Sequence, residues 1–493
     1  MPSSPTPFDP TKPWPLFDVA ATKRIEHLAL QREPPHTLMQ RAGLAAARLA
    51  LALAPHARHI WIAAGPGNNG GDGLEAAAHL RRWGKPTAVT WLGTQTGSSP
   101  DTAAALQRAT DAGVEFIDAP PARFDLCLDA LLGIGASRPP EGRMAAWIDH
   151  MNQAAAPILA IDLPTGLDAD TGHCAGRHVR AHATLGLLTL KPGLFTAMGR
   201  DAAGRVWLDD LQVDLASPDF ARIASPCAIG GGQPAARRRR HASHKGSHGD
   251  VVIVGGAPGM AGAALLAASA ALNFGAGRVY LVPLDPNLTS ATLTQPELML
   301  RQVDAVQWGG STVVCGCGGG DAVRAHLPRV LSSAPQLVLD ADALNAIALD
   351  TQLQGQLCSR AARGWQTVLT PHPLEAARLL GGSGRSVQQD RLGAARQLAQ
   401  RFQCTVALKG SGTVLAAPQA LSRINTTGNA RLGSAGTGDV LAGAIGAAMA
   451  AGLPAFEAAW EAVYLHGLLA DQWPADRPLT ASLLALSLHP HSA

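Results

Sequence analysis

The residues of this chain that could do chemistry gather in glycine-rich turns. The turn at residues 65–73, GPGNNGGDG, follows an apolar run and precedes an amphipathic helical pattern. The turn at 433–439, GSAGTGD, precedes the apolar stretch 440–451. Backbone N–H groups at such helix N-termini are suited to hold a phosphate group. We therefore expect a phosphate-binding turn in each half of the chain.

Two common classes of phosphate-binding enzyme are excluded by what accompanies these turns. The first six residues of the 65–73 turn match GxGxxG, but a dehydrogenase of that type needs an acidic residue about 20 positions later to bind the ribose. Nothing acidic lies between Glu75 and Asp101. No GxxxxGK[ST] motif occurs either, which excludes a P-loop kinase or ATPase.

Polar side chains also end two other predicted strands of the first half. One strand ends at Asp129 and another at Asp162, which is followed by Thr165. Residues just past the carboxyl ends of parallel strands converge on one crevice, so we expect these three residues to meet Asn69. Carboxylate, amide and hydroxyl oxygens suit a hard cation, and the second carboxylate could act as a base. Taken singly, each aspartate is more often a turn or cap residue.

In the second half, Asp439 follows an anion-binding turn directly. A carboxylate in that position can accept a proton from a hydroxyl that attacks a phosphate, so we predict Asp439 as a catalytic base. The alternative is that Asp439 only complements the helix dipole. His372 ends another predicted strand, and Glu375 follows it in the first turn of a helix.

Lysine is scarce, which makes its positions informative. It occurs six times, and Lys191, Lys245 and Lys409 each adjoin glycine or Pro-Gly. An ammonium there could meet an oxyanion beside exposed backbone N–H groups, although chance retention in turns is the alternative.

The elements that must position these residues alternate between strand and helix patterns. Apolar runs predict strands at 59–64, 87–92, 124–129, 158–162, 183–190, 251–254, 279–282, 312–315, 337–340, 367–370 and 405–408. Helical patterns lie between most of them, which predicts parallel sheets covered by helices. The stretch 226–242 is rich in glycine, proline and arginine and reads as a linker. We predict two α/β domains, 19–225 and 243–493, after a flexible leader at 1–18.

Composition limits the partners and the compartment. The 493 residues contain 40 Lys plus Arg and 37 Asp plus Glu, so no uniform field exists to hold nucleic acid or an anionic membrane. No apolar stretch reaches the roughly 20 residues that span a bilayer, and the N-terminus lacks a secretory signal pattern. Seven scattered cysteines without zinc spacing fit a reduced compartment, so we expect a cytoplasmic protein.

In its motifs, the first half of the chain resembles the NAD(P)H-hydrate epimerases. The motifs GNNGGDG, DALLGIGASRP and DLPTGLDADTG occur in the family's order, over about residues 20–215. The resemblance implies a Rossmann-like three-layer α/β/α sandwich, with Asp162 contacting the reacting hydrate as a catalytic residue. It implies a potassium ion held by Asn69, Asp129 and Thr165. It implies that the substrate nucleotide is bound by Asn68, Asn69, Gly70, Gly71, Asp72, Gly133, Ile134, Gly135, Ala136, Ser137, Arg138 and Pro139.

The second half resembles the ribokinase-like NAD(P)H-hydrate dehydratases over about residues 243–475. The motifs are HKGSHGDVVIVGGAPGMAGAA, CGCGGG, LDADALN, LTPHPLE, LKGSGT and NARLGSAGTGDVLAG. The sequence departs from the family at Cys317 and Gly319, where proline and leucine are favoured. The resemblance implies magnesium, with Glu375 helping to hold it. It implies hydrate contacts at Ala263, Gly318, His372 and Asp439, and nucleotide contacts at Lys409, Gly410, Ser411, Gly412, Thr413 and Gly438.

Together the two resemblances imply a bifunctional repair enzyme. The first domain would interconvert the R and S hydrates of NADH and NADPH, and the second would dehydrate the S form with ADP, giving AMP and phosphate. We expect these small molecules as the partners, a homo-oligomer, and a need for potassium because no ammonium lies in the motifs of the first site. One alternative is a ribokinase-like kinase of a vitamin-type alcohol. Another is a first domain that binds nucleotides without catalysis.

Overall fold

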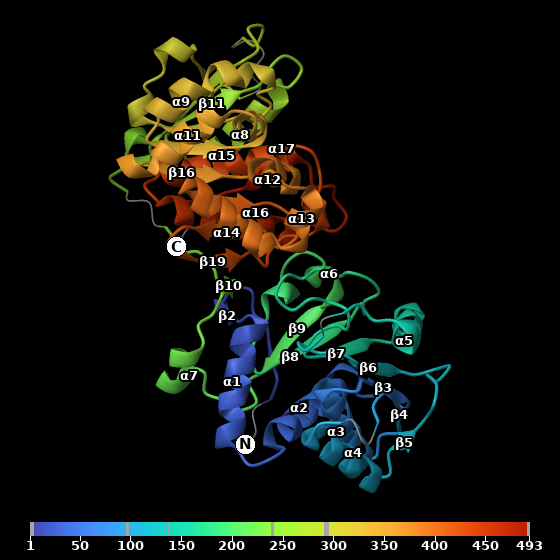
Figure 1. The fold of residues 1–493 in the computed structure, drawn as a ribbon. Helices are drawn as coiled ribbons and strands as arrows, with labels where there is room; N and C mark the ends of the chain where they lie inside the picture. Colours follow the sequence, from blue (N-terminus) through green and yellow to red (C-terminus); the bar gives the residue numbers. More distant parts are fainter. Residues whose placement is uncertain (1–3, 95–97, 137, 238–240, 290–294, 491–493) are drawn as a thin grey trace. The chain divides into compact units, whose positions relative to one another are not determined.

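The fold comes from a computed structural model that describes residues 4–490 except 95–97, 137, 238–240 and 290–294 (Figure 1). The chain divides into two compact units. Unit one comprises Met1–Asp9 and Trp14–Ala228, and unit two comprises Pro10–Pro13 and Ile229–Ala493. Each unit is built of strands and helices around a sheet, so the α/β class predicted from the sequence is confirmed.

Unit one holds a mostly parallel sheet. The strands of unit one are β1 Thr6–Pro7, β2 Trp14–Leu16, β3 Ile60–Ala64, β4 Thr87–Trp91, β5 Glu115–Phe116, β6 Leu126–Ala130, β7 Ile158–Ile161, β8 Ala183–Leu187 and β9 Arg205–Asp209, and all of them except β2 belong to this sheet. Its helices are α1 Val19–Arg32, α2 Thr37–Leu53, α3 Asn68–Arg82, α4 Pro100–Asp111, α5 Gly142–Gln153, α6 Gly199–Ala202 and α7 Pro218–Ile223.

The strand order of this sheet fixes where a ligand site belongs. The order is β1-β9-β8-β7-β6-β3-β4-β5, with only β1 antiparallel to its neighbour. The chain builds outward from β3 through β4 and β5 and then returns to the other side of β3 at β6. Ligands bind at such a switch point, outside the carboxyl ends of the strands.

Helices cover both faces of the unit-one sheet. Ile60 and Ile62 of β3 pack with α1, α2, α3 and α4 in one apolar core. Trp61, between them in the sequence, packs with α5 residues such as Ile148 in a second core. Successive strand residues point to opposite faces, so the two cores lie on opposite faces of the sheet. This is the predicted three-layer sandwich.

Unit two holds a second sheet. Its strands are β10 Ala228–Gly230, which begins at the last residue of unit one, β11 Asp250–Gly255, β12 Arg278–Pro283, β13 Met299–Leu300, β14 Thr312–Cys315, β15 Gln336–Leu339, β16 Gln366–Leu369, β17 Thr405–Leu408, β18 Val414–Ala417 and β19 Ala420–Ile424. Its helices are α8 Ala261–Asn273, α9 Leu327–Ser333, α10 Ala341–Ala348, α11 Thr351–Ser359, α12 Pro373–Leu380, α13 Gly384–Gln389, α14 Arg391–Phe402, α15 Thr437–Ala450, α16 Ala455–Gln472 and α17 Ala481–Ser487.

The unit-two sheet runs β13-β12-β11-β14-β15-β16-β17-β18-β19 and continues to β10. The strands from β13 to β17 are parallel, and β18 and β19 are antiparallel to their neighbours. The switch point lies between β11 and β14. Val251 and Ile253 pack in a core with α8, α15 and α16. Val252 and Val254, which point to the other face, are equally buried, so helices or loops cover both faces.

Part of the stretch predicted as a leader has regular structure. Strand β1 pairs with β9, and the Phe8 ring lies 4.6 Å from the ring of Phe195, centroid to centroid. The Trp14 indole N–H donates to the carbonyl of Asp9 at 2.9 Å. These aromatic side chains give the proline-rich start apolar surface to bury.

The predicted linker also contains structure. Strand β10 lies in it, and Arg237 Nη2 is 2.9 Å from Glu461 Oε2 on α16. The Glu461 side chain is 2% exposed. Removing one partner of a buried ion pair leaves the other charge without compensation.

We expect the unit-two fragment 229–493 to be more stable than the fragment 241–493, because only the longer one keeps Arg237 and residues 229–230 of β10. The difference in the free energy of unfolding should be about 2 kcal/mol. Urea unfolding of the two fragments measures it. Equal midpoints would show that the Arg237–Glu461 pair contributes nothing to this unit.

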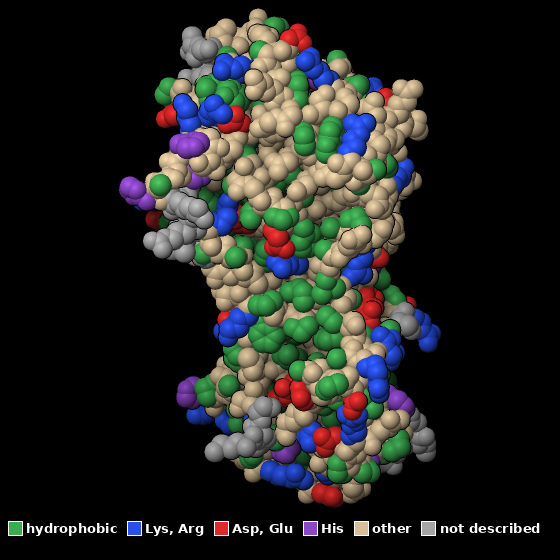
Figure 2. Space-filling model, turned by 90° about the vertical axis from the view of Figure 1, so that its left-hand side faces the viewer, with side chains coloured by type: hydrophobic (Ala, Val, Ile, Leu, Met, Phe, Trp, Pro, Cys, Tyr) green, Lys and Arg blue, Asp and Glu red, His purple; other side chains and the backbone are tan. Residues whose placement is uncertain are grey.

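Among the described residues, no helix combines the length and the apolar character needed to cross a membrane. On the face that Figure 2 shows, basic and acidic side chains are interspersed.

Candidate active sites

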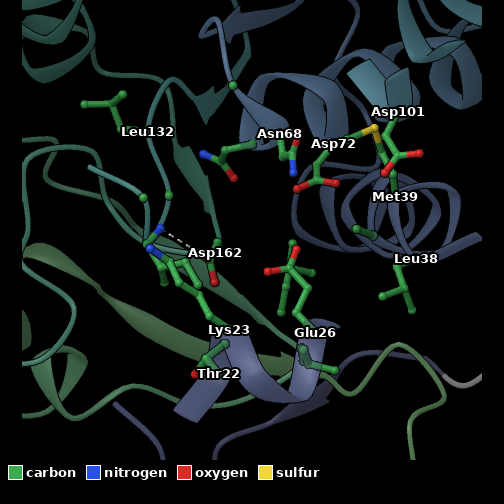
Figure 3. A pocket seen from close by; sticks show the side chains of 18 of the residues that line it. Thr22, Lys23, Glu26, Leu38, Met39, Asn68, Asp72, Asp101, Leu132 and Asp162 are labelled. Atoms are coloured by element: carbon green, nitrogen blue, oxygen red, sulfur yellow. Dashed lines mark hydrogen bonds between the residues drawn. The ribbon is translucent and has the colours of Figure 1, made fainter. Parts of the chain in front are cut away.

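Unit one contains a cavity of about 410 Å³ at its switch point (Figure 3). It lies between α1, α2, the start of α3 and the loop after β6. Of the residues predicted to bind substrate, those that line it are Asn68, Asn69, Asp72, Gly133, Ile134, Gly135, Ala136 and Asp162. Ser137 lies outside the described residues, and Arg138 and Pro139 are exposed and are not among the lining residues.

Two positions of the 65–73 turn require glycine because backbone carbonyl groups lie where a Cβ atom would be. A Cβ on Gly65 would lie 1.8 Å from the carbonyl oxygen of Leu131, and one on Gly70 would lie 2.0 Å from the carbonyl oxygen of Gly65. Gly71 faces the side chain of Met39. Gly70 and Gly71 therefore shape the turn, while Asn68 and Asp72 present their side chains to the cavity (Figure 3).

Asp162 and Lys191, which both line the cavity, form an ion pair. Asp162 Oδ1 accepts from Lys191 Nζ at 2.5 Å, and Asp162 Oδ2 accepts from the backbone N–H of Ile134 at 3.2 Å. Lys191 is 1% exposed and also donates to the carbonyl of Leu187 at 2.9 Å. Asp162 has a φ of +65°, a left-handed backbone conformation that is strained for residues other than glycine. Backbone strain of this kind is common at functional sites.

Lys191 brings an ammonium to the first site from outside its motifs, which themselves contain none. The sequence singles this lysine out because it precedes Pro-Gly, but nothing in the spacing places it beside Asp162. The pairing arises because β7 and β8 are neighbours in the sheet, so that the loops after them meet.

The residues predicted to hold potassium lie near this pair. Thr165 donates from its hydroxyl to Asp129 Oδ1 at 2.6 Å and from its backbone N–H to Asp129 Oδ2 at 2.8 Å. Burial raises the pKa of Asp129 to about 6. Asn69 is buried, and among the described residues neither its amide oxygen nor its amide nitrogen has a hydrogen-bond partner. A Cβ at Gly133 would be 3.0 Å from Asp162 Oδ2 and 3.4 Å from Asn69 Cβ, so both residues flank Gly133.

Two further carboxyl groups face Asp162 in the cavity. Glu26 reaches in from α1 toward Asp72 on α3 (Figure 3). Burial first, and the charge of Asp162 second, raise the pKa of Glu26 and raise that of Asp72 well above its ordinary range. Glu26 was not predicted, because a glutamate on an amphipathic helix gives no sequence signal of a site.

In unit two, Asp439 lies in the first turn of α15. The helix starts from Gly436, which has φ +89° and whose Cβ would meet Leu266 at 2.6 Å. Burial, followed by the charge of Asp340, raises the pKa of Asp439 to about 6. The start of α15 is also held by His466, which contacts the carbonyl of Thr437 at 3.0 Å.

Lys409 joins three of the predicted motifs. Its Nζ lies 2.5 Å from Asp340 Oδ1, and its backbone N–H donates to the carbonyl of Pro371 at 2.9 Å. A Cβ on Gly438 would lie 3.3 Å from Lys409 Nζ. The motifs LKGSGT, LDADALN and GTGD therefore meet at the carboxyl ends of β15 and β17. Asp340, which also accepts from the Thr370 hydroxyl at 2.8 Å, was not predicted as a site residue.

The loop that follows Lys409 is held by a buried arginine. Arg391 Nη2 donates to the carbonyls of Leu408 and Lys409, both at 3.1 Å. A Cβ on Gly410 would meet Arg391 Nη1 at 2.8 Å. Ser411, Gly412 and Thr413 continue this loop, and Arg391 is a support for it that the sequence did not reveal.

His372 and Glu375 form a reciprocal cap at the start of α12. The His372 ring accepts from the backbone N–H of Glu375 at 3.3 Å, and Glu375 Oε2 accepts from the backbone N–H of His372 at 2.8 Å. Burial raises the pKa of Glu375 to about 7. At the switch point of the sheet, after β11 and β14, a Cβ on Gly318 would lie 2.8 Å from Ala263 Cβ, so these two predicted contacts are adjacent.

The two sites differ in the chemistry that they allow. Unit one offers a carboxylate paired with an ammonium and two carboxyl groups of raised pKa, which suits proton transfer. Unit two offers a carboxylate at a helix N-terminus beside an ammonium and a glycine-rich loop, which suits attack of a hydroxyl on a phosphoryl group.

Comparison with known proteins agrees with this division. Residues 251–490 match a family model described as NAD(P)H-hydrate dehydratase, and residues 35–193 match one described as YjeF-related protein N-terminus. The bifunctional NAD(P)H-hydrate repair enzyme Nnr of Escherichia coli strain K12 is 37% identical over 453 residues, which are 88% of this chain and 85% of that protein. This chain belongs to the family of bifunctional NAD(P)H-hydrate repair enzymes.

Other members of this repair enzyme family match over similar lengths. The enzyme of Coxiella burnetii is 33% identical and covers 97% of this chain and 98% of its own length. Among solved structures, an ADP/ATP-dependent NAD(P)H-hydrate dehydratase from Bacillus subtilis is 28% identical, covers 51% of this chain and 91% of its own, and has a TM-score of 0.41. A ribokinase-like superfamily protein from Enterococcus faecalis V583 is 24% identical, covers 51% of this chain and 89% of its own, and has a TM-score of 0.44.

Proposed function

We propose that this chain repairs hydrated NADH and NADPH by two reactions, an epimerisation in residues 19–225 and a dehydration in residues 243–493. The family membership supports both reactions in one chain. The observation that carries the proposal is the meeting of Asp439, Lys409 and Asp340 at the end of the unit-two sheet. The homo-oligomer and the cytoplasmic location expected from the sequence stay predictions.

Epimerisation interconverts the R and S configurations at the ring carbon that carries the hydroxyl. Asp162 is the group that we place at the hydroxyl of this carbon, because it lines the cavity and is paired with Lys191. Asp162 would take the hydroxyl proton as the bond between this carbon and the ring nitrogen opens, while Glu26 or Asp72, whose raised pKa values keep more of the protonated form, gives a proton to that nitrogen. Closing the ring on the other face of the resulting aldehyde returns both protons and inverts the carbon. The N-terminus of α3 and the loop from Gly133 to Ala136 would hold the phosphates of the nucleotide.

We also propose a potassium ion in the first site, held by Asn69, Asp129 and Thr165. The buried amide of Asn69, which has no hydrogen-bond partner in the part of the chain that the structure describes, supports this assignment, because a buried polar group without a partner is costly. A large, weakly hydrated cation supplies positive charge near Asp162 when it is bound. Oxygen atoms of Asp129 and of the Thr165 hydroxyl would hold the ion in place.

Replacing potassium with sodium should slow epimerisation at least tenfold, since the smaller ion fits these oxygens poorly. Asp129→Ala should slow it similarly in either salt. The rate of epimer exchange measures both effects, with dehydration by the same preparation as the internal control. Equal exchange rates in the two salts would remove potassium from this site.

Dehydration needs the ring hydroxyl to become a leaving group. Asp439 would take the hydroxyl proton as the oxygen attacks the terminal phosphorus of ADP, releasing AMP. Lys409 and the N-terminus of α15 would stabilise the negative charge that develops on the phosphoryl group. Loss of the new phosphate ester together with a ring proton restores NADH or NADPH and releases inorganic phosphate.

The nucleotide contacts that we propose are Lys409, Gly410, Ser411, Gly412, Thr413 and Gly438, and the hydrate contacts are Ala263, Gly318, His372 and Asp439. Magnesium would enter with the phosphates of the nucleotide, as is usual for this ion. Glu375 fits it poorly, because His372 already occupies its oxygens and its pKa is near neutral.

Product analysis tests this function against the kinase of a vitamin-type alcohol. Phosphorus NMR of a reaction containing the S hydrate and ADP should show AMP and inorganic phosphate in equal amounts. A stable phosphate ester, with no recovery of the reduced cofactor, would contradict the proposal and favour the kinase.

A further inference from the structure

Cys317 is a buried side chain beside the proposed base that the mechanism above does not use. It follows β14 in a tight turn between Gly316 and Gly318, which have φ values of +118° and +58°. The side chain has no exposed surface. Its Sγ and one carboxylate oxygen each of Asp340 and Asp439 all lie within 4.8 Å of one another. Cys317 therefore approaches Asp439 from a different element of the fold.

Cys317 Sγ lies within 4.8 Å of a carboxylate oxygen of Asp439, where the thiol can donate a hydrogen bond to it, and the thiol lowers the pKa of that carboxyl. Burial first, and the charge of Asp439 second, raise the pKa of the thiol well above its ordinary range. The thiol thus keeps its proton at neutral pH and acts as the donor. A hydrogen bond donated to a carboxylate favours the ionised form, which is the form that can accept a proton.

The other groups that face Asp439 are charged. Burial and the Asp340 carboxylate raise its pKa, with a smaller effect from Asp342 on α10 in the same direction. The Lys409 ammonium lowers it, but this ammonium is also 2.5 Å from Asp340. The thiol is the uncharged group that opposes protonation of Asp439, so it can be removed without changing the net charge of the site.

We propose that Cys317 is a positioning residue of the dehydratase, whose thiol orients the Asp439 carboxylate for proton transfer from the hydrate hydroxyl. This inference rests on the proposed function of unit two. It assigns a role to a position where the chain departs from the proline favoured by the family that its motifs resemble.

Three variants of the full chain test the inference. Cys317→Ala removes the donor, Cys317→Ser keeps one, and Cys315→Ala removes a buried thiol two positions away as the matched control. The dehydration rate should be measured between about pH 5 and 8, where Asp439 titrates. In the wild type it falls as the pH drops below about 6, because Asp439 becomes protonated.

In Cys317→Ala we expect the acidic limb of the pH profile of kcat to move to higher pH by about one unit. This is the effect expected from losing one hydrogen bond to a charged group. The KM for ADP should change little, since Lys409 and the Gly410 loop are intact. Cys317→Ser should restore most of the wild-type profile, and Cys315→Ala should match the wild type. A Cys317→Ala profile that overlays both the wild type and the control would overturn the inference.

Infrared spectroscopy gives a second readout that needs no activity. The S–H stretching band of Cys317 is the band that disappears in Cys317→Ser. In the wild type it should shift when the pH is lowered through about 6, as Asp439 takes up a proton, and it should stay fixed in Asp439→Asn. A band that stays fixed in the wild type as well would overturn the inference. A wild type that does not dehydrate the hydrate would instead refute the proposed function, and the infrared band would still decide the contact.

Discussion

Replacing Asp439 with asparagine should lower the rate of dehydration by roughly 10²–10⁴-fold, the usual contribution of a general base. Asparagine keeps the size of the side chain and can still contact Cys317, but it cannot accept the hydroxyl proton. The affinity for ADP should change much less, because Lys409 and the backbone N–H groups around Gly438 remain. Single-turnover dehydration and ADP titration of the one variant measure both quantities.

Two controls accompany the Asp439 variant. Epimer exchange should be unchanged, because it occurs in the other unit, and Asp476→Asn removes an exposed carboxyl from the same unit without effect on either reaction. Near-normal dehydration by Asp439→Asn would take this residue out of the mechanism. Loss of epimer exchange as well would show a folding defect.

The second large effect is expected at Asp162. Asp162→Asn removes the carboxylate that we place at the reacting carbon and leaves the buried Lys191 ammonium without its partner. Epimerisation should fall by roughly 10²–10⁴-fold, and the unit should lose about 3 kcal/mol of stability. Exchange between purified R and S hydrates measures the first effect, and urea unfolding measures the second.

Asp111→Asn, at an exposed position on α4, is the matched control for Asp162. Dehydration of the S hydrate should be normal in both variants. If Asp162→Asn unfolds unit one, the double variant Asp162→Asn with Lys191→Met removes both charges and should recover stability without recovering exchange. Recovered exchange in the double variant would exclude both residues as catalytic groups.

The sequence predicted the site-bearing parts of the fold because they are encoded locally. Glycine-rich turns after apolar runs mark where a strand passes into a helix, and parallel order then brings Asp162 and Asp129, and likewise Lys409 and Gly438, to one edge of a sheet. The predicted strands match those of the structure with small differences at their ends. Each of these predictions needed only a short window of residues and one topological rule.

The partners of these residues could not be predicted in the same way. Lys191 reaches Asp162 across neighbouring strands, and Glu26 reaches the cavity from a helix whose pattern is that of any amphipathic helix. Cys317 reads from the sequence as a small core residue, and only the fold brings its thiol to Asp439. Such contacts depend on how loops from distant segments meet, which neither periodicity nor motif spacing contains.

The most direct test of the account is to give the intact chain a mixture of R and S hydrates of NADH with ADP and potassium, and to follow the absorbance of the reduced nicotinamide. We predict that all of the hydrate returns to NADH, with one AMP and one inorganic phosphate for each molecule restored. Recovery that stops at the fraction initially present as the S form would contradict the first reaction. No recovery of NADH, with ADP consumed or not, would contradict the second.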